Sequence, residues 1–222
     1  TKTVMVTSSV SGEGKTFCSI NIASVFALSG KKVVLVGLDL RKPKIFDDFE
    51  IKNDIGAVNY LIGQKSLEAI TQKTKIEHLD LIVSGPVPPN PSELLMGESM
   101  DQFIDELKAK YDYIVLDTPP IGLVSDALEL VEYVDASLYV VRQDYTKKGM
   151  LSLINDKYKK GEISNLSFIY NFYNQKGKYG YGYGYGYGYG YGYGAYGNGY
   201  HEDEVKKTSW LKRLTAFLKR KK

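Results

Sequence analysis

Residues 3–16 read TVMVTSSVSGEGKT, an apolar run followed by a glycine-rich loop that ends in Lys15 and Thr16. The β-branched residues of the run are typical of a buried strand. In such a loop, glycines let backbone N–H groups converge on phosphate, the lysine reaches the β and γ oxygens, and the threonine hydroxyl binds Mg²⁺. The strict pattern begins with glycine six residues before the lysine, and Ser9 occupies that place here. The stretch still predicts a phosphate-binding loop between a strand and a helix.

The loop and the first turn of the following helix are the expected contacts of a bound nucleotide. These predicted binding residues are Ser11, Gly12, Glu13, Gly14, Lys15, Thr16 and Phe17. Within this group we expect the Glu13 side chain to face solvent. Cys18, one turn into the helix, is expected to be a small core residue rather than a nucleophile.

Short apolar runs alternate with longer amphipathic stretches from Thr1 to about Tyr173. The predicted strands are Thr3–Thr7, Lys32–Leu38, Leu79–Val83, Tyr113–Asp117, Ala136–Val141 and Leu166–Tyr170. The predicted helices are Lys15–Ser29, Ser92–Lys110, Ser125–Tyr133 and Lys147–Lys159, with Gly30 as a stop signal and Ser92 as an N-cap. This alternation predicts an α/β fold with a doubly wound, mostly parallel sheet like that of P-loop NTPases, over residues 1–173.

Two acidic residues follow or end predicted strands. Asp117 ends the apolar strand Tyr113–Asp117, and Asp39 follows another apolar run. Because the carboxyl ends of parallel strands open on the edge where the phosphate loop lies, both carboxylates are expected near the nucleotide. We therefore predict Lys15, Asp39 and Asp117 as catalytic residues, and Thr16, Asp39 and Asp117 as metal ligands.

Residues 174–200 have a different composition, since tyrosine alternates with glycine through most of the segment. With no β-branched residue, no aliphatic residue larger than alanine and glycine at alternate positions, this segment is predicted to be a flexible tail. A strand with all its tyrosines on one face remains an alternative, because the repeat has a period of two. The tail tyrosines are Tyr179, Tyr181, Tyr183, Tyr185, Tyr187, Tyr189, Tyr191, Tyr193, Tyr196 and Tyr200.

Residues 201–222 carry the basic character of the chain. Residues 206–222 hold eight Lys or Arg and no acid, whereas residues 1–200 hold 21 bases and 23 acids. We therefore expect no nucleic-acid partner for the domain. The apolar residues of 208–222 recur at helical spacing among the bases, which predicts an amphipathic helix that docks either on protein or on an anionic membrane surface.

The chain contains no run of about 18 apolar residues, so we expect no helix that spans a bilayer. One Cys is compatible with a reducing compartment. Strand-like sequence begins at once after Thr1, from which we expect no secretory signal and a fragment of a longer protein.

Three segments together resemble the bacterial protein-tyrosine kinases that regulate capsular and exopolysaccharide export. They are the phosphate loop, the strand leading to Asp39 with Arg41-Lys42-Pro43 after it, and Asp117-Thr118-Pro119-Pro120. The segment PPNPSELL at residues 88–95 and the tyrosine-rich tail match this family as well. The resemblance implies a tyrosine autokinase with ATP and Mg²⁺ as cofactors and the ten tail tyrosines as phosphoacceptors. It also implies that Asn171 lies where relatives contact adenine.

One residue departs from the family pattern. The family usually has Asp-x-Asp at the second motif, but this chain reads Gly37-Leu38-Asp39. Residues 37 and 39 of a strand point to the same face, so one carboxylate of an expected pair is missing. Asp39 could serve both as base and as metal contact, or charge stabilisation and positioning could suffice for phosphoryl transfer.

The resemblance further implies partners and a place in the cell. It implies transfer in trans within a ring of subunits, a membrane activator either fused upstream or separate, and a tyrosine phosphatase. It places the protein at the cytoplasmic face of the bacterial inner membrane.

Two other classes stay open. A partition or positioning ATPase shares the fold, but many of these have an additional lysine five residues before the main one, where this chain has Val10. A nucleotide-binding adaptor without catalysis is the other class, and Gly37 makes it plausible.

Overall fold

The computed structural model describes residues 2–122 and 126–174, and the described strands form one sheet in the order β3-β4-β2-β5-β1-β6-β7. Every neighbouring pair is parallel except β3 with β4. The strands are β1 (Thr3–Ser8), β2 (Val33–Gly37), β3 (Gln72–Lys73), β4 (Leu79–Ile82), β5 (Tyr113–Asp117), β6 (Ala136–Arg142) and β7 (Leu166–Asn171). The predicted doubly wound, mostly parallel sheet is confirmed.

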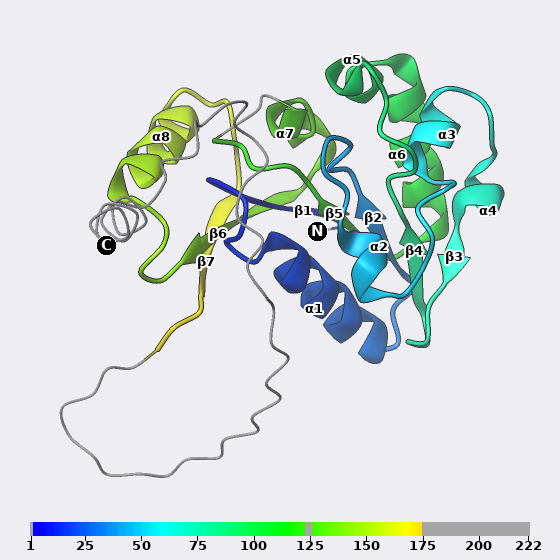
Figure 1. Ribbon diagram of the computed structural model, residues 1–222, viewed down its shortest axis with the longest axis horizontal. Helices are drawn as coiled ribbons and strands as arrows, with labels where there is room; N and C mark the ends of the chain where they lie inside the picture. Colours follow the sequence, from blue (N-terminus) through cyan, green and yellow to red (C-terminus); the bar gives the residue numbers. More distant parts are fainter. Residues whose placement is uncertain (1, 123–125, 175–222) are drawn as a thin grey trace, which may run out of the picture. The chain divides into compact units, whose positions relative to one another are not determined.

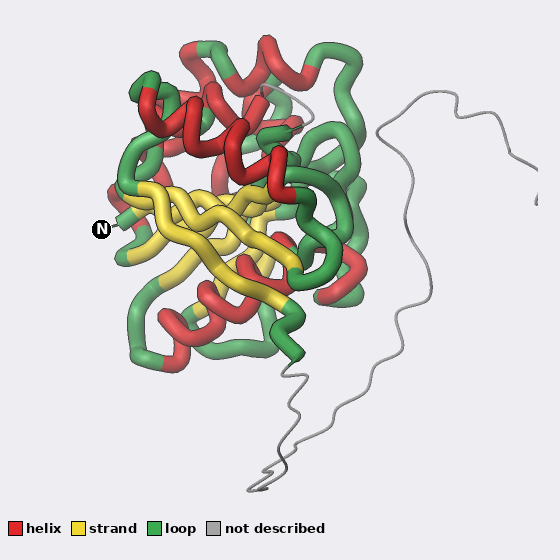
Figure 2. Tube along the Cα trace, turned by 90° about the vertical axis from the view of Figure 1, so that its left-hand side faces the viewer, coloured by secondary structure: helices red, strands yellow, loops and turns green. Residues whose placement is uncertain are grey.

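Helices lie on both sides of this sheet (Figures 1 and 2). They are α1 (Lys15–Leu28), α2 (Ile45–Asp48), α3 (Ala57–Leu61), α4 (Leu67–Ile70), α5 (Pro91–Leu95), α6 (Glu98–Lys110), α7 (Asp126–Glu129), the 3-10 turn η1 (Val131–Tyr133) and α8 (Lys148–Lys159). Alternate residues of β2 join different apolar clusters: Val33 and Leu35 pack in the cluster of α1, and Val34 and Val36 in the cluster of α6. Two-sided burial explains why this strand is apolar at successive positions.

The strand register brings the ends of three strands together at one edge of the sheet. Strand β5 lies between β1 and β2, and its last residue, Asp117, pairs with Val6 of β1 and Gly37 of β2. The loop that follows β1 and the segment that follows β2 therefore leave the sheet on either side of Asp117. This edge is where ligands bind in open α/β sheets.

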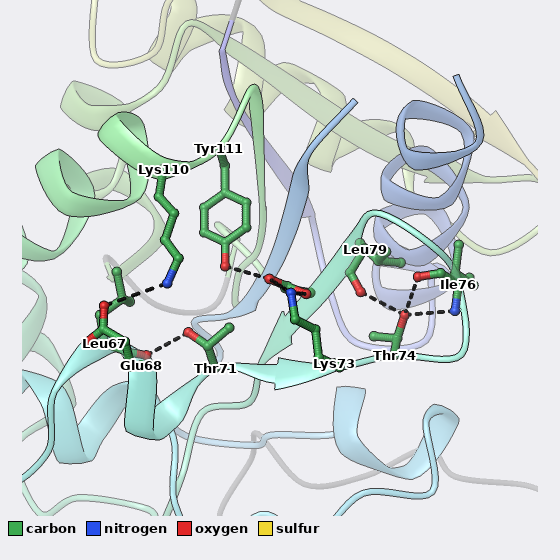
Figure 3. Close-up of polar contacts among 10 residues, drawn as sticks. Leu67, Glu68, Thr71, Lys73, Thr74, Ile76, Leu79, Lys110 and Tyr111 are labelled. Atoms are coloured by element: carbon green, nitrogen blue, oxygen red, sulfur yellow. Dashed lines mark hydrogen bonds and ion pairs between the residues drawn. The ribbon is translucent and has the colours of Figure 1, made fainter. Parts of the chain in front are cut away.

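The antiparallel strand β3 pairs with β4 at one edge of the sheet, and a buried carboxylate of β4 adds a side-chain contact between the two strands (Figure 3). Asp80 of β4 accepts a hydrogen bond of 2.8 Å from the Tyr111 hydroxyl and pairs with the Lys73 ammonium at 2.8 Å. Burial, and the hydrogen bond to Asp80, raise the pKa of Tyr111. The Tyr111 hydroxyl therefore stays protonated and acts as a donor to this carboxylate.

The helix predictions needed three corrections. The predicted helix Ser92–Lys110 is two helices, α5 and α6, because the backbone at Gly97 is extended. Ser92 is not an N-cap, since Asn90 precedes the helix and Pro91 begins it. The predicted helix Ser125–Tyr133 is replaced by α7 and the turn η1 in the described residues.

Two smaller expectations of the sequence are confirmed. Gly30 follows the end of α1 with a left-handed φ of 79°, as a stop signal requires. Cys18 is buried within the apolar cluster of α1.

No helix in the described ranges is long and apolar enough to cross a bilayer. The predicted tail tyrosines and the predicted amphipathic helix of 208–222 lie outside the described residues.

Candidate nucleotide-binding site

The loop between β1 and α1 has backbone conformations that only glycine adopts easily. Gly12 and Gly14 have φ values of 86° and 96°, both in the left-handed region. A Cβ at position 14 would lie 2.1 Å from the Asn171 amide nitrogen, so a side chain there would collide with β7. The two glycines thus allow a tight loop at the N-terminus of α1, where N–H groups and the helix dipole favour anions.

Lys15, Thr16 and Asp117 meet at the start of this helix. The Thr16 hydroxyl donates to Asp117 Oδ2 at 2.9 Å, and the Ser19 hydroxyl donates to Asp117 Oδ1 at 3.0 Å. Lys15 is only 9% exposed, and its positive charge lowers the pKa of the Asp117 carboxyl. Three residues that the sequence predicts for one site are therefore in contact or electrostatically coupled.

Burial has the largest effect on the pKa of Asp117. It raises the pKa of this carboxyl to about 6, although the Lys15 charge and the hydrogen bonds from Thr16 and Ser19 act in the opposite direction. The charge of Asp39 raises the pKa further, so the two acids are coupled. Asp117 is therefore ionised for most of the time at neutral pH but close to its titration range.

Asp39 lies two residues beyond the end of β2 and is half-buried. Its Oδ1 accepts a hydrogen bond of 3.0 Å from the backbone N–H of Lys42, which folds the Arg41-Lys42 segment back on the acid. At Gly37, a Cβ would lie 2.9 Å from Ile45 Cγ2 and 3.1 Å from Ser84 Oγ. Neighbouring side chains thus approach the place where the family resemblance predicts a second carboxylate.

Glu13 does not face solvent, so that prediction is wrong. Its side chain is fully buried. Oε2 accepts a 2.9 Å hydrogen bond from the backbone N–H of Val10, and Oε1 accepts one from the Thr146 hydroxyl. Phe17, in contrast, keeps 65% of its surface exposed on α1. Asn171 lies at the end of β7, and its amide donates to the Glu13 carbonyl at 3.0 Å.

The segment that follows β2 is joined to the rest of the site edge by an ion pair. Arg41 donates through Nε and Nη2 to the two carboxylate oxygens of Asp126 at 2.7 and 3.0 Å, and Ser92 also donates to Asp126 at 2.8 Å. Burial opposes ionisation of Asp126, but the hydrogen bonds from Arg41 and Ser92 outweigh it and hold the pKa of this carboxyl below its ordinary value. The segment after β2 and the first turn of α5 are thereby joined to the start of α7.

Four residues of the site edge escaped the sequence analysis. They are Ser19, Arg142, Tyr145 and Thr146. Ser19 lies four residues after Lys15, so helical spacing could have revealed it. The other three lie at or just after the end of β6, and the rule that places sites at the carboxyl ends of parallel strands would have included them.

The donor set fits Mg²⁺ together with a polyphosphate. A hydroxyl and a carboxylate are hard oxygen ligands, and Mg²⁺ is commonly bound by one or two carboxylates together with substrate phosphates. Within residues 2–122 and 126–174, no group of three or more His, Cys, Asp or Glu side chains could hold a metal by itself. The Thr16 hydroxyl and the Asp117 carboxylate suit a magnesium ion that arrives with a nucleotide.

A parallel sheet that carries this loop, lysine and acid at one edge defines a P-loop nucleotide-binding protein. Residues 1–164 match the family described as AAA domain, and the chain belongs to this family.

Bacterial tyrosine-protein kinases are among its most similar relatives. The chain is 43% identical over 147 residues to tyrosine-protein kinase YwqD of Bacillus subtilis, covering 66% of this chain and 62% of the relative. It superposes on the kinase domain of Escherichia coli tyrosine kinase ETK with a TM-score of 0.75 and 34% identity, covering 83% of this chain and 72% of the other. The chain spans less than two thirds of the length of the first curated relatives.

A more distant likeness supports the fold alone. The septum site-determining protein MinD of Pyrococcus horikoshii, solved with Mg-ADP, superposes with a TM-score of 0.63 at 22% identity, covering 76% of this chain and 69% of the other.

Proposed function

We propose that this chain binds MgATP at the loop of residues 11–17 and transfers the γ-phosphoryl group to tyrosines of its segment 179–200. The observation that carries this proposal is the contact of Thr16 with Asp117 beside the buried Lys15. The likeness to tyrosine-protein kinases supports the choice of phosphoryl transfer as the reaction.

Each residue of the site has a chemical task in this proposal. Lys15 and the loop N–H groups bind the phosphates and stabilise the charge that shifts during transfer. Thr16, Asp117 and Asp39 would hold a magnesium ion, which would supply further charge neutralisation. A tyrosine hydroxyl has an ordinary pKa near 10, so it must lose its proton during attack, and Asp39 is the proposed acceptor of that proton.

The composition of the C-terminal segment supports tyrosine as the acceptor. From Lys176 to Lys207 the chain contains no Ser or Thr, whereas residues 179–200 contain ten tyrosines. A glycine-rich coil of 27 residues, the length of segment 174–200, has an r.m.s. span of roughly 30 Å and a stretched reach of about 90 Å. Such a tail can reach either its own site or the site of a neighbouring copy, and we propose transfer in trans within an oligomer. Each phosphate adds about −1.5 to −2 charges, so phosphorylated tails would repel one another and loosen the oligomer.

We further propose that the chain works at the cytoplasmic face of the bacterial inner membrane, in capsular or exopolysaccharide assembly. The resemblance of its motifs to the bacterial tyrosine kinases of capsule and exopolysaccharide export supports this role. We propose two partners on the same ground: a membrane activator, either fused upstream or separate, and a tyrosine phosphatase. The basic, apolar segment 208–222 would contact anionic lipid in such a setting. The proposed units are the kinase domain of residues 1–173, the acceptor tail of 174–200 and the basic segment of 201–222.

The kinase proposal is tested by incubating the purified chain with MgATP and probing for phosphotyrosine, with Lys15→Met as the matched variant. Phosphotyrosine in the wild-type chain and its absence from the variant support the proposal. ATP hydrolysis that anionic vesicles stimulate, without phosphotyrosine, would instead indicate a positioning-type ATPase. Nucleotide binding with neither outcome would indicate an adaptor.

A further inference from the structure

Three successive carbonyl oxygens of the phosphate loop accept hydrogen bonds from side chains near the ends of β6 and β7. The donor and acceptor pairs are Tyr145 Oη with Ser11 at 3.0 Å, Arg142 Nη1 with Gly12 at 2.6 Å, and Asn171 Nδ2 with Glu13 at 3.0 Å. The donors come from parts of the chain about 130 to 158 residues away in sequence. The carbonyl side of the loop is therefore bonded to the β6–β7 side of the sheet.

These bonds also set where the N–H groups of the loop point. In a planar trans peptide, the carbonyl of one residue and the N–H of the next point in opposite directions. Because the carbonyls of residues 11–13 face their donors, the N–H groups of residues 12–14 face the other way. Those N–H groups are the ones that a phosphate-binding loop must present to its anion.

The Glu13 carboxylate adds a second attachment between the same segments. It accepts from Val10 N–H at one end of the loop and from the Thr146 hydroxyl, whose oxygen in turn accepts a 2.9 Å hydrogen bond from Arg142 N–H. Glu13 is fully buried, so its oxygens depend on these donors and not on water. The carboxylate thus closes the loop on itself and bonds it to the residues that follow β6.

Aromatic rings keep the arginine donor in place. The Arg142 guanidinium lies 4.0 Å from the ring centroid of Phe172 and 4.9 Å from that of Tyr145. A guanidinium in contact with two rings loses less freedom when it donates a hydrogen bond, because its orientation is already restricted. This favours a loop whose shape is fixed before a ligand arrives.

We propose that Arg142, Tyr145, Thr146 and Asn171, acting with Glu13, form a loop strap that fixes the phosphate-binding conformation in the nucleotide-free protein. They are positioning residues, since they act on the loop and not on the reacting atoms. Only the predicted effect of the loop strap on nucleotide affinity rests on the proposed function. The effect on the loop itself exists without nucleotide.

The test uses two variants of the strap and one matched control in the full chain. Tyr145→Phe removes a single oxygen from a side chain that is 46% exposed, and Thr146→Val removes the donor to Glu13. Tyr158→Phe is the control, because Tyr158 is exposed near the end of α8 and away from the loop. The first measurement is amide hydrogen exchange of peptides covering residues 8–17 without nucleotide. The second is the Kd for MgADP.

The loop strap predicts faster exchange of residues 8–17 in both variants and a Kd for MgADP about 3- to 10-fold weaker, as for loss of one hydrogen bond. It also predicts that KM for ATP rises while kcat at saturating ATP stays within about twofold, because positioning before binding is what is lost. Tyr158→Phe should match the wild type in every measurement.

Unchanged exchange and unchanged Kd in both strap variants would overturn the inference. Equal effects in Tyr158→Phe would overturn it as well. A wild-type chain that fails to bind MgADP would refute the proposed function, and the exchange data without nucleotide would still decide whether the strap exists.

Discussion

The Thr16 hydroxyl donates a 2.9 Å hydrogen bond to the Asp117 carboxylate, although the two residues are 101 positions apart. The contact joins the first turn of α1 to the end of β5. It forms because β1, which leads into the loop, and β5 are neighbouring parallel strands whose carboxyl ends meet at one edge.

This pair predicts that Thr16→Val selectively weakens magnesium-dependent binding. The valine has similar shape but no hydroxyl, so one oxygen ligand is lost. We expect the Kd for MgADP to rise roughly 10-fold or more, while binding of ADP in EDTA changes little. Titration calorimetry of both forms measures this, with Thr16→Ser as the variant that keeps the hydroxyl and should bind as the wild type. Equal magnesium dependence in Thr16→Val and the wild type would argue against Thr16 as a ligand.

Asp117 gives a prediction for the pH dependence of stability without nucleotide. Burial raises its pKa to about 6, so between about pH 4 and 6 the folded chain binds more protons than the unfolded chain, and its stability falls as pH rises. Asp117→Asn removes this titration. We expect the variant to exceed the wild type in stability by about 1 to 3 kcal/mol at pH 7.5, with the gap closing toward pH 4.

Thermal unfolding of both proteins across this pH range measures the gap. Asp105→Asn, at an exposed position of α6, is the control and should show no such trend. A gap of constant size at all pH values would contradict the role of burial at Asp117.

The ion pair of Arg41 with Asp126 predicts a loss of stability in Arg41→Ala. The variant leaves the Asp126 carboxylate, 2% exposed, without its cation. We expect a loss of about 2 kcal/mol, less than for a fully buried pair because 38% of the Arg41 side chain is exposed. Lys75→Ala removes the exposed partner of Glu50 and should stay within about 0.5 kcal/mol of the wild type. Chemical denaturation that gives equal losses for the two variants would contradict this prediction.

The crowded surroundings of Gly37 predict that Gly37→Asp, which adds the carboxylate of the family pattern, lowers the stability of this chain. Gly37→Asp would place a Cβ 2.9 Å from Ile45 Cγ2, so we expect a loss of about 1 to 3 kcal/mol from overpacking. Ile45→Ala removes that methyl group, and in the double variant the loss should be smaller than the sum of the single losses. Additive losses in thermal or chemical unfolding would show that the two positions do not compete for space.

The central strands could be predicted from the sequence because both faces of the sheet are covered. Two-sided burial leaves continuous apolar runs such as Val33–Val36, and the loop motif fixes where the first strand ends. The placement of Asp117 beside Thr16 follows from that same rule on strand ends. The short helices α2, α3 and α4 were missed because four or five residues are too few for helical periodicity to be recognised.

The surroundings of the loop could not be predicted in the same way. The burial of Glu13 depends on Thr146, and that contact depends on β6 lying next to β1. Local sequence contains no information on which strand is the neighbour of β1. The prediction of Ser92 as an N-cap was wrong for a similar reason. Its hydroxyl donates a hydrogen bond to Asp126, which is distant in sequence, and not to the backbone at the start of a helix.

The central claim is that the chain is a kinase that carries its own acceptors. Its most direct test is the intact mass of three proteins after incubation with MgATP: the wild type, Lys15→Met, and a variant with all ten tyrosines of 179–200 changed to Phe. The account predicts several additions of about 80 Da, one per phosphate, in the wild type and none in either variant. An unmodified wild-type chain, or additions that persist in the Phe variant, would contradict it.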